Sequence, residues 1–471
     1  MPALRFMLNG EWRSEERASP TMSVLDYLRT VARLTGTKEG CAEGDCGACT
    51  IAVACPDKDQ HAYQAVNSCL MMVGQLDGLS VMTVEGLARG DGGLHPVQQA
   101  LVDTDATQCG FCTPGFVMSM FAFHQAGERI TETAVHEALA GNLCRCTGYR
   151  PIIEACRRLA GLPPFVQPLA KEDAERLAVS PDEPVGFTAP RSLGALASAL
   201  AARPQAWLLG GGTDLGLLVS KERQSPTDVI STARVPELKN IAVTADALEL
   251  GGAVTYSAAL PHLDDLFPAF GALVRRIGSR QIRNLGTIAG NLATASPIGD
   301  TLPCLIALEA RVVLRRTTGA RHMSVEDFIT GYRKTALAPG EFIETICIPR
   351  LAGRQRFFAY KLSKRFDQDI SAVIAAFRIA ISGGKVASLR AVYGGVAPTP
   401  ARAKALEMVL TGHPWNSEAL AAIDAALARD LSPIGDHRAS ASYRLDAAAN
   451  LVRRLHADSS GDEPSVRLEA L

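Results

Sequence analysis

Eight cysteines in the first third of the chain have spacings that are typical of iron–sulfur ligands. They form two sets, Cys41-x4-Cys46-x2-Cys49 with Cys69, and Cys109-x2-Cys112 with Cys144-x-Cys146. Four cysteine thiolates can hold one 2Fe–2S cluster, and the x4–x2 triplet is the plant-ferredoxin spacing. Two such sets in one chain predict at least two one-electron centres in series.

Zinc is the main alternative metal that the first set of cysteines could bind. Zinc sites favour paired Cys-x2–4-Cys knuckles, whereas this set is a triplet among Gly40, Gly44 and Gly47. Those glycines permit the unusual dihedral angles that let backbone amides point at sulfur in a compact loop. We therefore interpret the first set as cluster ligands and keep zinc as the alternative.

The second set is unusual because Cys144 and Cys146 are separated by one residue, which requires an extended or turned backbone. Cys109-x2-Cys112 alone could be a redox dithiol, but the segments QCGFCTPG and GNLCRCTGYR together favour a second cluster. A helix that opens at Thr113 and Pro114 would set backbone amides near the sulfurs. Four further thiols have no ligand spacing and are interpreted as small buried hydrophobic residues, namely Cys55, Cys156, Cys304 and Cys347.

Bulk composition restricts the class of protein. The chain has 471 residues, a formal net charge of −1, 21% charged residues and 47% hydrophobic residues. This length predicts about three or four domains, and the balanced charge indicates neither nucleic acid nor membrane as a partner. No secretory signal opens the sequence, and the apolar stretch near 372–381 is too short to span a bilayer. We expect a cytoplasmic protein, in which clustered cysteines more often indicate metal or redox chemistry than disulfides.

The first half of the chain predicts strands and then helices. Residues 1–85 predict short strands, with a tight turn at Asn9–Gly10 and a helix over Ser23–Arg33. Residues 95–160 carry helical periodicity and predict a small bundle. Pro163–Asp182 is Pro-rich and charged with little periodicity, so it is the best linker candidate.

The second half mixes strands and helices from Gly186 to about Pro349. From Arg356 onward we expect three strands, followed by Ala-rich helices near Ala401–Leu410, Glu418–Arg429 and Ala439–His456. The final residues, Ala457–Leu471, are expected to form a frayed tail.

Two segments rich in small residues predict a dinucleotide site. Leu208–Lys221 (LLGGGTDLGLLVSK) runs from an apolar strand into three glycines, whose amides can form a nest for a pyrophosphate. It is neither a GxGxxG fingerprint nor a Walker A loop. Leu285–Pro303 is a second loop with amide, hydroxyl and carboxylate groups. For Asn291 and Asp300, turn capping is the structural alternative.

Together these motifs resemble the xanthine dehydrogenase family within the molybdenum hydroxylases. KEGCAEGDCGACT, QCGFCTPGF, GNLCRCTGYRPI, GGGTDL, ASPIGD and YKLSKRFDQDIS stand in the family's order, and the resemblance covers almost the whole chain. The match is closest to the small, iron–sulfur and FAD-carrying subunit of a bacterial member of the family.

The resemblance implies a multidomain α+β fold. We expect a β-grasp, plant-type 2Fe–2S ferredoxin-like domain at 1–86 and a helical 2Fe–2S-binding domain at 87–162. A linker at 163–185 leads to an FAD-binding domain of the VAO/PCMH type at 186–353. A C-terminal domain like the CO dehydrogenase flavoprotein follows at 354–460, with a tail at 461–471.

The resemblance also implies FAD contacts. The first loop supplies Leu208, Leu209, Gly210, Gly211, Gly212, Thr213, Asp214 and Leu215, and the second supplies Thr287, Ile288, Ala289, Gly290 and Asn291. Further contacts are expected from Asp300, Ile343, Lys361 and Asp369. Ile277 stands where the family usually has a phenylalanine beside the isoalloxazine, so ring stacking is lost there. Asp369 and Arg365 are candidates for tuning charge where NAD arrives, and a solvated loop is the alternative for Arg365 and Asp367. Gln108 resembles a position that contacts the pterin of a partner subunit.

By the same resemblance, the chain is the small subunit of an (αβ)2 heterotetramer with a molybdopterin-binding large subunit. Hypoxanthine and xanthine are oxidised to urate on that partner, and electrons pass through the second cluster, the first cluster and FAD to NAD. The flavin is needed because it accepts single electrons and delivers a hydride. We expect no residue for the hydroxylation itself here, because the sequence ends after the flavin module.

Three alternatives stay open. Carbon monoxide dehydrogenases and aldehyde or nicotinate hydroxylases share these modules, although the fused cluster and flavin domains and the KLSKRFDQDIS segment favour the xanthine type. An oxidase that passes electrons to oxygen would carry the same motifs. A zinc-stabilised scaffold without redox activity is the alternative from a different class of protein.

Overall fold

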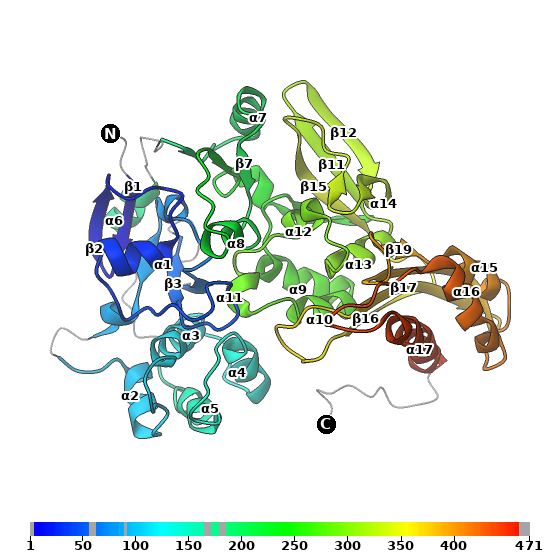
Figure 1. Ribbon diagram of the computed structural model, residues 1–471, viewed down its shortest axis with the longest axis horizontal. Helices are drawn as coiled ribbons and strands as arrows, with labels where there is room; N and C mark the ends of the chain where they lie inside the picture. The colour runs from blue at the N-terminus through cyan, green and yellow to red at the C-terminus, as the bar shows by residue number, and fades with distance from the viewer. Residues whose placement is uncertain (1–3, 56–62, 89–91, 164–170, 179–184, 461–471) are drawn as a thin grey trace. The chain divides into compact units, whose positions relative to one another are not determined.

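The computed structural model describes residues 4–55, 63–88, 92–163, 171–178 and 185–460. The chain divides into two compact units, drawn in Figure 1. One comprises Met1–Pro236 and Gly278–Gly286, and the other comprises Glu237–Ile277 and Thr287–Leu471. The region expected to bind FAD, 186–353, therefore contributes segments to both units.

A five-stranded sheet opens the first unit. Its order is β2-β1-β5-β3-β4, with β1 at Leu4–Leu8, β2 at Glu11–Glu15, β3 at Thr50–Ala54, β4 at Gln64–Asn67 and β5 at Ser80–Met82. The β1–β2 hairpin turns at Asn9 and Gly10, which both have positive φ, as the tight hairpin turns require. The expected helix after Ser23 is irregular: α1 at Val24–Asp26 continues as a π-helix at Tyr27–Val31 and packs on the sheet.

A short 3-10 helix at Val73–Leu76 connects β4 to β5, and a second, at Val84–Leu87, follows β5 and precedes a helical bundle. The bundle consists of α2 at Pro96–Asp103, α3 at Thr113–Gln125, α4 at Glu132–Leu139 and α5 at Arg150–Arg157. α3 is buried on every face from Gly115 to Gln125. This is the pattern of a central helix, and α3 contacts α2 and α4 as well as strands β3 and β4.

A parallel three-stranded sheet, β6-β8-β7, completes the first unit. Its strands are β6 at Phe187–Thr188, β7 at Trp207–Leu209 and β8 at Val229–Ser231, and its helices are α7 at Leu193–Ala202 and α8 at Leu215–Ser220. The short helix α11 at Arg280–Arg283 enters this unit from much later in the sequence.

The segment expected to be a linker contains a helix, α6 at Lys171–Ala178. The indole Nε1 of Trp12 donates to Asp173 at 2.8 Å, and the Arg176 guanidinium lies 4.1 Å from the Trp12 ring centroid. Leu177 is buried. The helical periodicity of this segment is too short to indicate a helix from the sequence. Contacts with Trp12 on β2 hold the helix in place. The rest of the expected linker lies largely outside the described residues.

The first sheet of the second unit is antiparallel, in the order β12-β11-β15-β10-β9. Its strands are β9 at Ile241–Val243, β10 at Ala247–Gly251, β11 at Arg311–Arg316, β12 at Gly319–Ser324 and β15 at Phe342–Pro349. The small hairpin of β13 at Ile329–Gly331 and β14 at Lys334–Thr335 lies nearby in the chain. The helices are α9 at Tyr256–Leu266, α10 at Pro268–Arg275, α12 at Ile288–Thr294, α13 at Thr301–Ala307 and α14 at Val325–Phe328, after a 3-10 turn at Pro236–Lys239.

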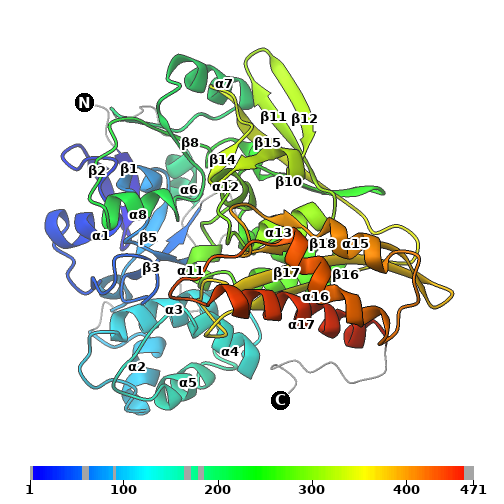
Figure 2. The same cartoon turned by 45° about the vertical axis from the view of Figure 1, so that its right-hand side comes forward.

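The second sheet of this unit is also antiparallel, in the order β16-β17-β18-β19. Its strands are β16 at Gln355–Leu362, β17 at Val373–Ser382, β18 at Lys385–Gly394 and β19 at Ala401–Arg402. Helices α15 at Lys404–Leu410, α16 at Ile423–Asp430, preceded by a 3-10 turn at Ala419–Ala422, and α17 at Ala441–Ser460 follow it. Figure 2 shows these helices gathered over the sheet.

Strand β17 is buried on both faces, which explains its long apolar run. Ile374 and Ala376 belong to the core shared with the first sheet of the unit and with α13, whereas Val373, Ala375 and Phe377 belong to the core under α15–α17. Successive side chains of a strand point to opposite faces. A continuous apolar sequence is therefore required here.

Two expected boundaries are corrected. Helix α15 begins at Lys404 instead of Ala401, because Ala401 and Arg402 pair with β18 as β19. The expected frayed tail from Ala457 is helical to Ser460, since the Trp415 indole donates to Ser459 Oγ at 2.8 Å and Tyr360 donates to Asp458 at 2.8 Å. Residues 461–471 lie outside the described part. None of the described helices has the length and apolar character that crossing a membrane requires.

Candidate iron–sulfur and flavin sites

The four cysteines of the first set converge in pairs in the loop before β3 and just after β4. Cys41 and Cys46 exchange amide-to-sulfur hydrogen bonds, each 3.3 Å long, and the Cys49 and Cys69 sulfurs are 3.3 Å apart. Glu43 also donates its amide to Cys41 Sγ at 3.4 Å. A hydrogen bond from the Cys46 side chain lowers the pKa of Cys41 to about 5, and the same contact raises the pKa of Cys46. Two sulfur pairs with amides directed at them fit a 2Fe–2S cluster.

The second set also forms two pairs, at the start of α3 and before α5. The Cys146 and Cys109 sulfurs are 3.6 Å apart. Burial, together with a hydrogen bond with Cys144, raises the pKa of Cys112 to about 12. Helix α3 begins at Thr113 with Pro114 in its first turn, as expected. The pairing of the sulfurs also fits a 2Fe–2S cluster. Cys109 and Cys146 are exposed, whereas Cys144 is buried, so one edge of this set lies at the surface.

The two cysteine loops are in direct backbone contact. The amide of Leu143, next to Cys144, donates to the carbonyl of Cys46 at 3.0 Å. The Asn142 side chain donates to the Gly47 carbonyl at 3.0 Å. A Cβ on Gly47 would lie 2.2 Å from the Gly141 carbonyl oxygen, and a Cβ on Gly115 would lie 2.2 Å from that of Gly47. Glycine is therefore needed for this close approach.

Gln281, from α11, was not predicted and lies at the centre of this contact. It is completely buried, and its Nε2 lies 3.2 Å from Thr50 Oγ1, 3.1 Å from Ser119 Oγ and 3.1 Å from Asn142 Oδ1. On either side, Arg280 pairs with Glu128 and Arg283 pairs with Glu137. No periodicity or motif spacing marked this segment, because its partners lie 139 or more residues away along the chain.

We predict that Gly115→Ala separates the two cysteine loops. Alanine normally favours a helix over glycine by about 1 kcal/mol, but the added methyl group would overlap the Gly47 carbonyl. Overpacking of this kind costs about 1–3 kcal/mol, so we expect a lower unfolding midpoint and a weaker magnetic interaction between the two clusters in electron paramagnetic resonance (EPR) spectra. Gly194→Ala, in α7 with open space around it, is the control and should be neutral or stabilising. If the two variants have the same unfolding midpoint and the same magnetic interaction between the clusters, close packing at Gly115 is not required.

The predicted phosphate loop follows β7 in the first unit. Gly212 has φ +80, and a Cβ on Gly211 would lie 1.7 Å from the Leu285 carbonyl oxygen. After the loop, α8 packs so closely that a Cβ on Gly216 would lie 2.2 Å from the carbonyl of Leu70, the residue after Cys69. Ser220 Oγ donates to the Ala42 carbonyl at 2.7 Å. Leu208 and Leu209 thus end β7, Gly210–Asp214 form the loop, and Leu215 begins α8, the helix that contacts the loop of the first cysteine set.

The remaining predicted flavin residues lie in the second unit, and two of them form a buried ion pair. Asp300 Oδ2 lies 2.6 Å from Lys361 Nζ, and Asp300 Oδ1 accepts from Ser371 Oγ at 2.6 Å. The side chains of Asp300 and Lys361 are 9% and 2% exposed. The Asp300 carboxylate makes no capping bond to α13, so turn capping does not account for it.

The second predicted flavin loop, Thr287–Asn291, forms the N-terminus of α12. Thr287 caps α12 by accepting the Gly290 amide at 2.9 Å, while Ile288 and Ala289 are buried. Asn291 Oδ1 accepts from the Thr301 hydroxyl at 2.6 Å. The Asn291 side chain therefore has a structural contact of its own. Its predicted role toward FAD stays a prediction.

Three other predicted positions are distributed over the second unit. Ile343 is buried on β15, and Ile277 packs against the apolar core of the unit. Asp369 accepts the amides of Arg365 at 2.8 Å and Ile370 at 3.1 Å. Burial opposes ionisation of Asp369, but these amides and the Arg365 guanidinium lower its pKa overall. Asp369 and Arg365 therefore order their own loop.

Arg276 is a further residue that the sequence did not indicate. Its guanidinium donates to the Lys361 carbonyl at 2.9 Å, to the Phe366 carbonyl at 3.2 Å and to Ser363 Oγ at 3.2 Å, and it stacks 4.5 Å from the Phe366 ring centroid. In return, Lys361 Nζ donates to the Arg276 carbonyl at 2.9 Å. Arg276 thus joins the buried ion pair to the loop around Phe366.

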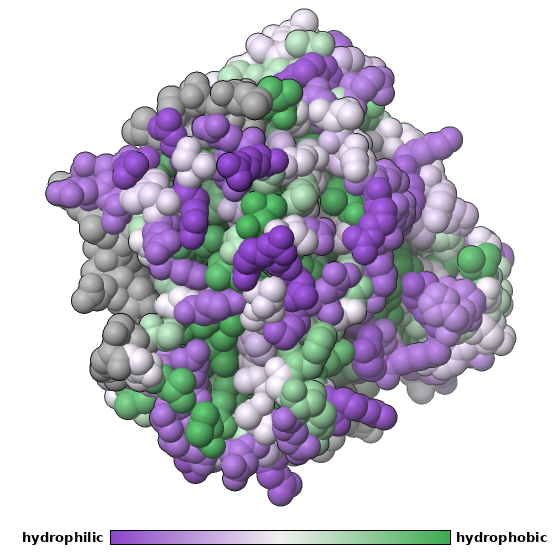
Figure 3. Space-filling view, turned by 60° about the vertical axis from the view of Figure 1, so that its left-hand side comes forward, coloured by the Kyte–Doolittle hydropathy of each residue, from purple (hydrophilic) through white to green (hydrophobic). Residues whose placement is uncertain are grey.

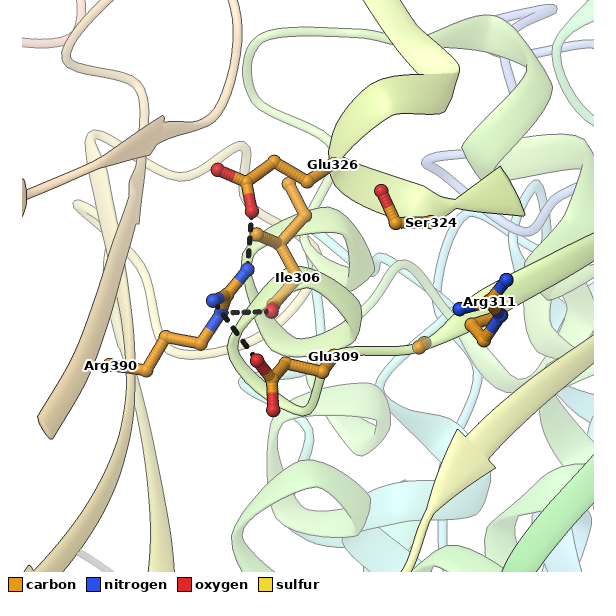
Figure 4. Close-up of a pocket in the computed structure, with 7 residues that line it drawn as sticks. Ile306, Glu309, Arg311, Ser324, Glu326 and Arg390 are labelled. Carbon is orange, nitrogen blue, oxygen red and sulfur yellow. Dashed lines mark hydrogen bonds and ion pairs between the residues drawn. The ribbon is translucent and has the colours of Figure 1, made fainter. Parts of the chain in front are cut away.

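A cavity of about 260 Å³ lies between α13, β11, α14 and β18 in the second unit. Figure 4 shows the Arg390 guanidinium between two carboxylates: it pairs with Glu326 and with Glu309, at 3.3 Å, and donates to the Ile306 carbonyl at 2.9 Å. The cavity is smaller than most ligand sites. Its central cation has internal partners, so we interpret it as an ion-paired contact between the two sheets of the unit.

The four cysteines without ligand spacing differ in burial. Cys156 and Cys304 are completely buried, as expected. Cys55 and Cys347 are only half-buried, which corrects the expectation for these two. Cys55 follows the end of β3, and Cys347 lies on β15, where one side of the strand is less covered.

Comparison with known families identifies four successive segments. Residues 6–74 match the 2Fe-2S iron-sulfur cluster binding domain, and 83–157 match the [2Fe-2S] binding domain. Residues 183–351 match the FAD binding domain in molybdopterin dehydrogenase, and 358–459 match the CO dehydrogenase flavoprotein C-terminal domain. The predicted multidomain α+β fold is confirmed, and the domain boundaries stay predictions.

Individual relatives agree with this result. The chain is 31% identical to xanthine dehydrogenase of Emericella nidulans, over 97% of this chain and 38% of the relative, and 32% identical to xanthine dehydrogenase 2 of Arabidopsis thaliana, over 84% and 35%. It thus spans little more than a third of these relatives. Among solved structures, carbon monoxide dehydrogenase of Hydrogenophaga pseudoflava aligns with a TM-score of 0.54 and 29% identity, over 57% of this chain and 94% of the other.

The fold and the sites define an iron–sulfur flavoprotein with two 2Fe–2S domains and an FAD-binding domain. The chain belongs to the xanthine dehydrogenase/molybdenum hydroxylase family and corresponds to its iron–sulfur and FAD portion. The family matches disfavour a zinc scaffold, because both cysteine sets fall within iron–sulfur domains.

Proposed function

We propose that this chain carries electrons from a molybdenum centre through two 2Fe–2S clusters to FAD and on to NAD, during oxidation of hypoxanthine and xanthine to urate. The observation that carries the proposal is the 3.0 Å hydrogen bond from the Leu143 amide to the Cys46 carbonyl. It connects the residue next to Cys144 with a ligand of the other set. A short path of covalent bonds and one hydrogen bond thus runs between the two proposed clusters.

The order of transfer is argued from exposure and contact within the first unit. Cys109 and Cys146 are exposed, so an external donor can approach the second set. The first set contains the buried Cys49 and Cys69, and its loop is touched by α8, which follows the phosphate loop. Electrons are therefore proposed to enter at the second set and leave toward the flavin from the first.

The donor is proposed to be a molybdopterin-binding subunit, in an (αβ)2 heterotetramer. Two apolar side chains next to cysteines of the second set in the sequence are exposed, Phe111 by 47% and Leu143 by 45%. Figure 3 shows a face on which apolar groups are scattered among hydrophilic ones. Exposed apolar groups beside a redox centre are consistent with a protein partner there, and Gln108 lies next to this edge in the sequence.

In the first unit, FAD is proposed to contact Leu208–Leu215. In the second unit, taken by itself, the family resemblance proposes contacts from Thr287–Asn291, Asp300, Ile343, Lys361 and Asp369. When bound, FAD would accept single electrons and deliver a hydride to NAD. Asp300 and the Arg276 carbonyl hold the Lys361 ammonium group in place. Ile277 cannot stack an aromatic ring on the flavin, so we expect a different flavin affinity or NAD access from that of relatives with phenylalanine.

A second candidate has support in the similarity to carbon monoxide dehydrogenase. An equivalent subunit could serve a molybdenum hydroxylase that oxidises carbon monoxide, an aldehyde or nicotinate, because the substrate is bound elsewhere. Transfer to oxygen in place of NAD is the other open point. Both alternatives leave the proposed electron path unchanged.

The decisive experiment mixes the complex of this chain and its molybdopterin partner with substrate under anaerobic conditions. We expect xanthine to bleach the visible absorbance of both clusters and the flavin, and NAD to restore it. If carbon monoxide or an aldehyde bleaches the absorbance and xanthine does not, the proposal that xanthine is the substrate is wrong. If oxygen restores the absorbance and NAD does not, the proposal that NAD is the electron acceptor is wrong. A colourless chain with bound zinc would contradict the electron path itself.

A further inference from the structure

A threonine hydroxyl lies against one sulfur of the second set. Thr147 Oγ1 is 3.1 Å from Cys144 Sγ. The same oxygen accepts the Tyr149 amide at 3.2 Å. Because an oxygen that accepts this amide keeps its own hydrogen for donation, and a metal-bound thiolate has no hydrogen to donate, the bond runs from the Thr147 hydroxyl to the Cys144 sulfur.

The loop that carries this hydroxyl is closed at both ends. The Cys144 amide donates to the Tyr149 hydroxyl at 3.0 Å, and the Tyr149 ring packs edge-on against Phe116 with 6.5 Å between centroids. Tyr149 has φ +67 and Gly148 has φ +66. A non-glycine residue in this region is strained and persists only where its surroundings hold it. These contacts therefore fix the position of Thr147.

Cys144 is the ligand at which such a bond has the most direct consequence for transfer. It is buried, at 8% exposure, and its preceding residue donates the hydrogen bond to Cys46. The hydroxyls nearest Cys109 and Cys112 in the sequence, on Thr107 and Thr113, bond to each other at 2.7 Å. In the first set, sulfurs accept from backbone amides, and the Asn67 side chain lies 3.7 Å from Cys49 Sγ. Cys144 likewise has backbone hydrogen bonds, with Thr147 and Cys146, beside the one with the Thr147 hydroxyl.

We propose that Thr147 sets the reduction potential of the second cluster through this hydrogen bond, an inference that rests on the proposed role of the two sets as clusters. Hydrogen bonds to cysteine sulfur withdraw negative charge and stabilise the reduced state, and they are among the determinants of the potential of iron–sulfur clusters. The Thr147 hydroxyl therefore makes the second cluster a better electron acceptor. It acts through Cys144 and touches neither substrate nor flavin.

The test compares Thr147→Val, which keeps the shape and removes the hydroxyl, with Thr147→Ser, which keeps the hydroxyl. For each variant, the reduction potentials of the first and second clusters are measured in the complete complex by redox titration followed by EPR. We expect Val to lower the potential of the second cluster and leave that of the first unchanged, while Ser stays near wild type. Thr104→Val is the matched control, because the Thr104 hydroxyl donates to the Ala100 carbonyl at 2.8 Å, and no hydrogen bond joins it to a cysteine in the described part of the chain.

An unchanged second-cluster potential in Thr147→Val, with full iron content, would overturn the proposal. An equal shift in Thr104→Val would overturn it as well. Thr147→Ala removes the same hydroxyl with less bulk and replaces the Val variant if that variant loses iron. Absence of both cluster signals in the wild-type complex would instead contradict the cluster assignment, so the two failures are distinguishable.

Discussion

Replacing Cys41 by alanine is expected to remove one of two clusters and to stop electron flow to the flavin. Its sulfur accepts the Cys46 amide at 3.3 Å, and its own amide donates to the Cys46 sulfur at 3.3 Å. Alanine has no sulfur to bind iron. Iron content should fall from about four to about two atoms per chain. Turnover should fall by more than the roughly 10–100-fold that follows loss of a residue hydrogen-bonded to a metal ligand, because the proposed step before the flavin is removed.

Iron analysis and stopped-flow absorbance measure both effects. Reduction of the second cluster by substrate should persist, since its four cysteines are unchanged. Cys347→Ala is the matched control, because Cys347 is half-buried and has no ligand spacing. A Cys41→Ala protein that keeps about four irons and normal turnover would rule out Cys41 as a ligand.

The second large effect is expected at the buried ion pair of the second unit. Lys361→Met removes the ammonium group that lies 2.6 Å from Asp300 and leaves a carboxylate nearly without solvent. Removing one partner of a buried pair costs about 3–5 kcal/mol. We expect a large drop in the denaturant midpoint of the purified protein, and a lower FAD content if Lys361 contacts the cofactor as proposed.

Lys364→Met is the control, because the exposed Lys364 donates to the His437 carbonyl at 2.8 Å and to no other group among the described residues. Such surface changes are usually within about 0.5 kcal/mol. Combining Lys361→Met with Asp300→Asn should recover part of the loss, since no charge is then left buried. Similar midpoints for Lys361→Met and Lys364→Met would show that the pair contributes little to stability.

Local pattern predicted much of the fold. The helix at Thr113–Gln125 was expected from a proline in its first turn and from periodicity, and the Asn9–Gly10 turn from residues that tolerate positive φ. The expected strand near 370–381 corresponds to β17. Each of these features depends on residues close in sequence, whose conformational preferences act before any tertiary contact forms.

The errors have a common physical cause. Helix α6 was missed because contacts with Trp12, about 160 residues earlier, stabilise a segment whose own periodicity is short. The sequence around the last turn of α17 predicts fraying because Trp415 and Tyr360, which hold that turn, lie far away in the chain. Local propensity cannot register such contacts.

The two cysteine sets were evident from the sequence because ligand spacing within a loop is a local property, and the family matches agree with the cluster chemistry it indicated. The tertiary structure decided how the sets are joined. The Leu143–Cys46 hydrogen bond, the interlocked Gly47 and Gly115, and the insertion of Gln281 join residues that are far apart along the chain. Which distant backbones meet depends on packing of the whole unit, so spacing predicted the ligands and only the fold decided the path between them.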